Sequence, residues 1–179
     1  MVISLNKITS LLLTAVLVSC LTACIGQKEE PVSGKYNFSG TTLTIVVPEG
    51  WFETTISGEK YPLFYTTVEY GIKPNVRLEE VFAISSPENE HELERYFEKQ
   101  LEMYPDYSIL SKEAFETAEN KRVDKVIATR KNQDNIPIIH ISYLLSTTSN
   151  KYLLLATFAE PGRKKFEKIF DEIAKTSTI

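Results

Sequence analysis

Cys24 is the residue of this chain whose surroundings point most directly to covalent chemistry. It follows the tripeptide Leu-Thr-Ala at 21–23, which comes after an apolar run covering 8–19, and Lys7 precedes that run. The run is shorter than the ~20 apolar residues that a transmembrane helix needs. A positive start, a short apolar stretch and small residues before a cut are typical of an export segment that is removed.

This arrangement resembles the signal peptides of bacterial lipoproteins. The resemblance implies a leader over 1–23, cleavage before Cys24, and acyl chains on the cysteine sulfur and on the new amino terminus. Two or more acyl chains anchor a protein firmly, since each buried CH₂ contributes about 0.8 kcal/mol. We therefore expect a protein held at a membrane by lipid on Cys24.

Two alternatives to this assignment remain open. Cys20 also follows a fitting tripeptide, although the small Ala23 and the longer apolar run favour Cys24. An ordinary secretory leader with an accidental cysteine is the second alternative. Ile25 is not the Asp that resembles an inner-membrane retention signal, which favours the outer membrane if the cell has two.

Histidines are the next candidates for chemistry, and the chain has two. His140 shares a strand face with Ser142, which could form half of a nucleophilic pair, but no nucleophile elbow or acid partner accompanies them. His91 begins a zinc-protease-like motif, but Arg95 stands where the second histidine would be needed. We expect a hydrogen-bonded structural His140, a solvated His91, and neither a metal nor a cofactor.

The elements that would position these residues follow from hydrophobic periodicity. Alternating residues predict strands, and apolar residues at steps of three and four predict helices. Between 107 and 118 the pattern is less regular, and we expect one short strand and a loop there. The predicted strands are 41–47, 63–70, 76–84, 122–130, 136–146 and 151–159, and the predicted helices are 87–104 and 161–175.

Short loops between the late strands indicate antiparallel neighbours. The pattern therefore predicts an α+β fold, with an antiparallel sheet of about six to seven strands covered by helices. Leu93, Phe97 and Leu101 would form the inward stripe of the first helix. The polar segment 24–34 is expected to be a flexible tether, and 35–179 a single domain.

Charge and aromatic content narrow the possible partners. The net charge is −4, and removal of the leader with its Lys7 makes it −5, which argues against a nucleic-acid partner. The predicted strand 63–70 carries rings on both faces, which is typical of a central strand or a binding patch. The candidate binding surface comprises Tyr61, Tyr65, Tyr70 and His140.

The order of these elements also resembles a known family. The turn at 46–51, Val-Val-Pro-Glu-Gly-Trp, and a late strand pair followed by a closing helix look like the PsbP-like family. That family includes bacterial envelope lipoproteins of the DcrB and LpqN type, and the resemblance covers 35–173. It implies an α/β/α sandwich and a non-enzymatic binding or assembly role with an envelope protein partner. A small hydrolase using His140 and a purely structural surface lipoprotein are the rival hypotheses.

Overall fold

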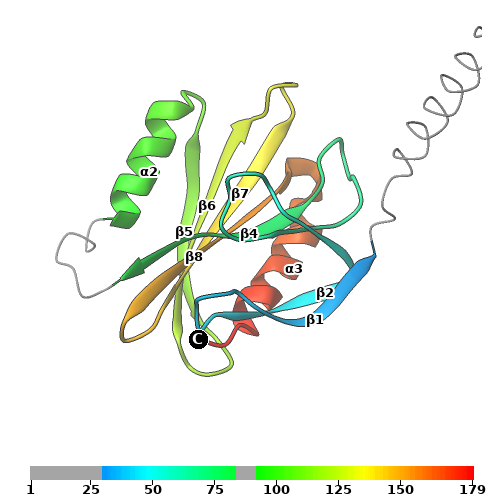
Figure 1. The fold of residues 1–179 in the computed structure, drawn as a ribbon. Coiled ribbons are helices and arrows are strands. Elements are labelled where there is room, and N and C mark those ends of the chain that lie inside the picture. Colours follow the sequence, from blue (N-terminus) through cyan, green and yellow to red (C-terminus); the bar gives the residue numbers. More distant parts are fainter. Residues whose placement is uncertain (1–29, 84–91) are drawn as a thin grey trace, which may run out of the picture. The chain divides into compact units, whose positions relative to one another are not determined.

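One antiparallel sheet organises the domain. The computed structural model describes residues 30–83 and 92–179, and 31–179 form one compact unit. The sheet has eight strands in the order β1-β2-β3-β4-β8-β7-β6-β5 (Figure 1). The strands are β1 Pro31–Asn37, β2 Thr44–Thr54, β3 Leu63–Tyr65, β4 Asn75–Ala83, β5 Ser108–Glu116, β6 Arg122–Lys131, β7 Pro137–Ser146 and β8 Asn150–Ala159.

The last strand in the chain, β8, lies in the interior of the sheet. It pairs with β4 on one side, through Val76↔Ala156, and with β7 on the other, through Ile141↔Ala156. Its residues are apolar on both faces, as an interior strand covered on each side requires. β8 therefore connects β4, which lies much earlier in the sequence, to the late meander that β5, β6, β7 and β8 form.

The face of the sheet covered by α3 holds the larger core. A short 3₁₀ turn, η3 Glu160–Gly162, leads into α3, Arg163–Lys175. Phe170 packs edge-on against Trp51, with ring centroids 5.6 Å apart, and stacks on Phe158 of β8. The inward stripe of α3 lies at steps of three and four residues: Phe166, Phe170 and Ile173 are buried, and Ile169 is partly buried.

The opposite face carries α2, Glu92–Met103, and a smaller core (Figure 1). Phe97 of this helix packs with Tyr107, Val126 and Ala128. The expected helix residues 87–91, with His91, lie outside the described residues. Leu101 was wrongly assigned to the inward stripe, since it is 47% exposed. The helix instead turns Tyr96 toward the sheet, and Tyr104, the residue after the helix, packs on the same cluster.

Three predictions on strands differ from the structure. Eight strands are present where six to seven were expected, because β1 begins at Pro31 inside the predicted tether and β5 is a full nine-residue strand. Both are edge strands that expose most of their residues, so their apolar pattern is weak. The predicted strand 63–70 ends at Tyr65, and its last residues lie in a turn closed by Glu69 and Ile72, where Tyr70 adopts the left-handed conformation with φ of 52°.

Candidate functional site

A polar cavity of about 260 Å³ lies between α2 and the sheet. Side chains from four strands of the sheet, from α2 and from the loop after α2 line this cavity. Residues far apart in the sequence therefore meet there. His140, one of the residues singled out in the sequence, forms part of its wall. The lining residues are Arg77, Glu79, Tyr96, Gln100, Met103, Tyr104, Tyr107, Arg130, His140 and Leu155.

Both ring nitrogens of His140 are engaged. Nε2 lies 3.0 Å from Nε of Arg130, and Nδ1 lies 3.0 Å from the hydroxyl of Thr157. A guanidinium only donates, so Nε2 must accept and the ring proton resides on Nδ1, which donates to Thr157. The ring of Tyr107 stacks on the imidazole with centroids 6.4 Å apart.

His140 is neutral in this setting. Burial, the largest cause, and the positive charges of Arg130 and Arg77 together lower its pKa from 6.5 to about 4. A neutral imidazole lets two guanidinium groups share the cavity without a third positive charge. The site is therefore built around the arginines, with the histidine as an uncharged support.

Arg130 is held rigidly at the cavity wall. Its guanidinium carbon lies 4.1 Å from the ring centroid of Tyr104, and Nη1 donates to the carbonyl of Lys131 at 3.1 Å. With Nε bonded to His140, the remaining N–H groups of Arg130 have no hydrogen-bond partner among the described residues. The Tyr104 face and His140 thus fix the cation and leave donors for a ligand.

Arg77 supplies the second positive charge. Its Nε donates to Glu79 at 2.6 Å, and Nη1 lies 3.9 Å from Glu59. Glu79 lines the cavity, whereas the side chain of Glu59 is 45% exposed and lies outside the lining. The residues that line the cavity thus include two guanidinium groups and one carboxylate. Counted over these lining residues, the cavity has one excess positive charge.

The possible nucleophilic pair of His140 and Ser142 does not form. Ser142 shares the face, as the strand period required, and is 3% exposed. However, His140 directs one nitrogen to Arg130 and the other to Thr157, so neither is available to take a proton from Ser142. A pKa near 4 also makes this imidazole a weak base at neutral pH.

The three tyrosines of the candidate binding surface do not gather around His140. Tyr61 is buried in the large core against Phe38 on the α3 side. Tyr65 is on the face of His140, but β4 and β8 lie between their strands, which separates them by about 14 Å. Tyr70 is 59% exposed in its turn. The structure thus places only His140 in a cavity.

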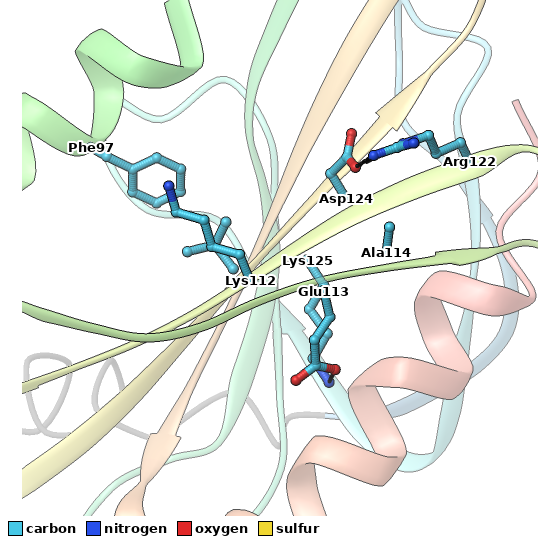
Figure 2. Close-up of a pocket in the computed structure, with 8 residues that line it drawn as sticks. Phe97, Lys112, Glu113, Ala114, Arg122, Asp124 and Lys125 are labelled. Carbon is cyan, nitrogen blue, oxygen red and sulfur yellow. Dashed lines mark hydrogen bonds and ion pairs between the residues drawn. The ribbon is translucent and has the colours of Figure 1, made fainter.

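A second pocket lies at the β5–β6 edge of the sheet. Figure 2 shows its residues, including the pair formed by Arg122 and Asp124 at 2.7 Å. It is a larger hollow, of about 460 Å³, lined also by Phe97 and Lys112. Arg122 in this pocket already donates through two nitrogens to the Asp124 carboxylate.

Lys125, which also lines this pocket, forms a buried ion-pair network. Its side chain is 2% exposed, and Nζ donates to Glu167 at 2.8 Å and to Asp171 at 3.0 Å (Figure 2 shows it directed toward α3). Tyr143 donates to the same Asp171 at 2.8 Å. Burial alone would lower the pKa of Lys125, but the hydrogen bonds to Glu167 and Asp171 outweigh it and raise that pKa.

Sequence reasoning missed Lys125 and both cavity arginines. Lys125 alternates with Val123 and Ile127 in a predicted strand, which was a usable signal, because a charge at an inward position of a strand needs a partner. For Arg77 and Arg130 no local signal existed, because their meeting depends on the order of β4, β8, β7 and β6. In the described part of the chain no group of His, Cys, Asp and Glu is placed to hold a metal, and no helix there could cross a membrane.

Comparison with solved structures identifies the fold. The chain is similar to cyanobacterial PsbP (CyanoP) from Synechocystis, with a TM-score of 0.60, 12% identity, and coverage of 87% of this chain and 95% of that one. It is also similar to LpqN of Mycobacterium tuberculosis, involved in cell envelope biogenesis, with a TM-score of 0.54, 11% identity and coverage of 86% of both chains. A Pseudomonas aeruginosa protein of unknown function, PA94, aligns with a TM-score of 0.51 and 7% identity, over 80% of this chain and 94% of that one.

These likenesses confirm the PsbP-like fold that the sequence resemblance implied. At 7–14% identity they show the arrangement of the chain and carry no residue roles. No protein-family model matches the sequence, and a search of curated proteins found no match either. The function has to be argued from the residues of this chain.

Proposed function

We propose that this chain is an exported, lipid-anchored binding protein of the cell envelope, without catalytic activity of its own. The Leu-Thr-Ala tripeptide before Cys24 supports the anchor. The likeness to LpqN, which is involved in cell envelope biogenesis, is consistent with that location. The ligand site in this proposal is the His140 cavity.

One observation carries the proposal: two guanidiniums and one carboxylate face a neutral imidazole inside a cavity. Arg130 is fixed by Tyr104 and His140 with donor groups to spare, and Arg77 adds a second cation. Such an arrangement stabilises one negative charge, because charge-assisted hydrogen bonds from arginine to an oxyanion are stronger than neutral ones. The ligand is a small monoanion bearing a carboxylate or phosphoryl group.

The size and lining of the cavity limit that ligand further. Sites for drug-sized molecules occupy roughly 300–1,000 Å³, and this cavity of about 260 Å³ is smaller. Tyr96, Tyr107 and Leu155 provide apolar and aromatic surface beside the arginines. A short organic acid with a planar or aliphatic body fits both features.

Calorimetric titration tests the site. The mature chain with Cys24→Ser, which removes the lipid, is titrated at pH 6 with inorganic phosphate, butyrate and benzoate, each of which is mainly a monoanion at that pH. We expect at least one of them to bind, with an affinity that falls at least tenfold in Arg130→Gln and is unchanged in Arg122→Gln. Arg122 is the matched control, since it lies in the other pocket and is paired with Asp124. Equal binding to both variants, or none to the parent chain, contradicts the anion site.

Mass spectrometry of the membrane-extracted protein tests the anchor. We expect an amino-terminal acylated Cys24, and Cys24→Ser should leave the protein in the membrane-free fraction or with its leader uncut. Acylation at Cys20, or an unmodified amino terminus, would contradict this assignment.

A further inference from the structure

A groove of about 580 Å³ runs between β2 and α3, on a different part of the domain from the His140 cavity. Val46 and Pro48 of β2 form one wall, and Ile169 and Ile173 of α3 form the other. Lys168 and Glu172 are exposed on its rim. Aliphatic walls with a charged rim are typical of a surface that another molecule covers.

β3 pairs with β2 only over Phe52–Thr54, so the part of β2 that forms the groove wall has no strand of the sheet on the side away from β1. Thr44 exchanges both of its backbone hydrogen bonds with Thr178, at 2.9 and 3.0 Å. Because backbone groups alternate along a strand, the N–H and C=O of Val46 point the same way as those of Thr44. After α3 ends at Lys175 the chain reaches this side of β2 at Thr178, and among the described residues no bridge forms beside Val46 there.

The register of β2 with β1 also indicates that the N–H and C=O of Val46 point away from β1. Leu43 accepts from the N–H of Phe38, which places the backbone groups of the odd-numbered residues of this segment on the β1 side. Ile45 pairs with Tyr36 and Val46 with Lys35 in the same ladder. The N–H of Val46 therefore forms no hydrogen bond with β1 or with the segment at Thr178. Pro48 has no N–H.

We propose that the β2–α3 groove binds an extended peptide segment of an envelope protein, which adds as a strand beside Val46. The Thr44–Thr178 pair shows that this edge already accepts a strand, and its antiparallel geometry sets the direction of the added one. Strand addition provides backbone hydrogen bonds for affinity, and side-chain pockets provide selectivity. Ile169 and Ile173 select aliphatic residues at alternate positions of the peptide.

The charges at the rim select an acidic residue in that peptide. Lys168 has no ion-pair partner among the described side chains, whereas Lys165 is bonded to Glu69 and Glu172 lies 3.7 Å from Lys175. An acidic side chain in the peptide pairs with Lys168 as the strand docks. The expected sequence is an alternation of aliphatic residues with one Asp or Glu.

The aliphatic walls of the groove make a lipid acyl chain the competing occupant. A lipid, unlike a peptide, forms no hydrogen bond with the N–H of Val46. Removal of that N–H therefore separates the two occupants.

Panning a random heptapeptide phage library against the mature Cys24→Ser chain tests the proposal. We expect enrichment of aliphatic-alternating sequences with one acid. Val46→Pro should weaken binding of the enriched peptides at least tenfold, and Val46→Thr, which keeps the N–H, should change it less than twofold. Val46→Pro removes no β1–β2 hydrogen bond, so its unfolding curve should stay close to that of the parent chain.

Three results overturn the proposal. One is the absence of any enriched sequence, and another is peptide binding that Val46→Pro leaves intact. The third is binding of phosphatidylglycerol vesicles that survives Val46→Pro and is lost in Ile169→Glu, which would assign the groove to lipid. Titration of inorganic phosphate into Val46→Pro reports separately on the His140 cavity, so failure of one site is distinguishable from failure of the other.

Discussion

The two faces of the sheet differ in how their positively charged side chains are paired with carboxylates. On the α3 face, Lys125 is surrounded by Glu167 and Asp171, and aromatic rings fill the remaining space. On the α2 face, Arg77 and Arg130 line a cavity with one carboxylate between them. A cation that is fully paired and enclosed contributes to stability, whereas a cation held in place with donors left over is suited to binding.

The largest expected effect is at Phe170 on the α3 face. Phe170→Ala removes a ring that is 1% exposed and packs on Trp51 and Phe158, and it should lower the free energy of unfolding by about 3–5 kcal/mol. Phe97→Ala on the α2 face should cost at least about 1 kcal/mol less, since its cluster is smaller. Urea denaturation of both variants, with Lys164→Ala as an exposed control, measures the difference. Equal losses at Phe97 and Phe170 would remove the contrast between the faces.

The ion-pair network on the α3 face should give the next largest effect. Lys125→Met leaves two carboxylates and Tyr143 without their cation, and we expect a loss of about 2–3 kcal/mol. This is below the ~3–5 kcal/mol for a fully buried pair, because the Glu167 and Asp171 side chains are 24% and 23% exposed. Arg122→Met, in an exposed pair, is the control and should unfold like the parent chain. A Lys125→Met variant as stable as its control would show that the network contributes nothing.

Acidification should destabilise the α2 face through His140. Its pKa is about 4 in the folded chain and near 6.5 when unfolded, so the unfolded state binds more protons between these values. Stability is fully present above pH 6.5 and falls as pH drops toward 4, by about 2 kcal/mol at pH 5. The difference between the parent chain and His140→Gln, measured by denaturation from pH 7.5 to 4.5, should show this slope. Parallel curves for the two proteins would mean that His140 is not held neutral.

The smallest effect concerns Leu101 on the outer side of α2. Because Leu101 is 47% exposed, Leu101→Gln should change the free energy of unfolding by less than about 0.5 kcal/mol. Thermal denaturation monitored by circular dichroism is sufficient to measure it. A loss comparable to that of Phe97→Ala would place Leu101 back in the inward stripe that the sequence predicted.

Local periodicity predicted the elements that face a core and missed those that do not. The inward stripe of α3 and the double-sided apolar pattern of β8 were readable, because each residue reports its own burial. β1 and β5 were missed or shortened because edge strands are held by backbone bonds, which leave little trace in side-chain pattern. The predicted strand that included Tyr70 was too long, because its last residues form a turn. An alternating side-chain pattern does not reveal such a turn.

The candidate site was predictable only in part. His140 was identified as an unusual polar residue in an apolar strand, but its partners Arg130 and Thr157 belong to two other strands. Their contact requires β8 to lie between β4 and β7, a topology that no local pattern encodes. The grouping of His140 with three tyrosines rested on residue type alone, and the structure separates them.

The interior position of β8 also bears on the proposed export. β4 pairs with β3 on one side and with β8 on the other, so residues near Val76 wait for their second partner, a segment about eighty positions later in the chain. Contacts of such long sequence separation form slowly, and the first half of the domain has no completed sheet before the carboxyl-terminal end is present. A chain that crosses a membrane amino terminus first would therefore stay unfolded during passage and close its sheet after the last strand and α3 have emerged.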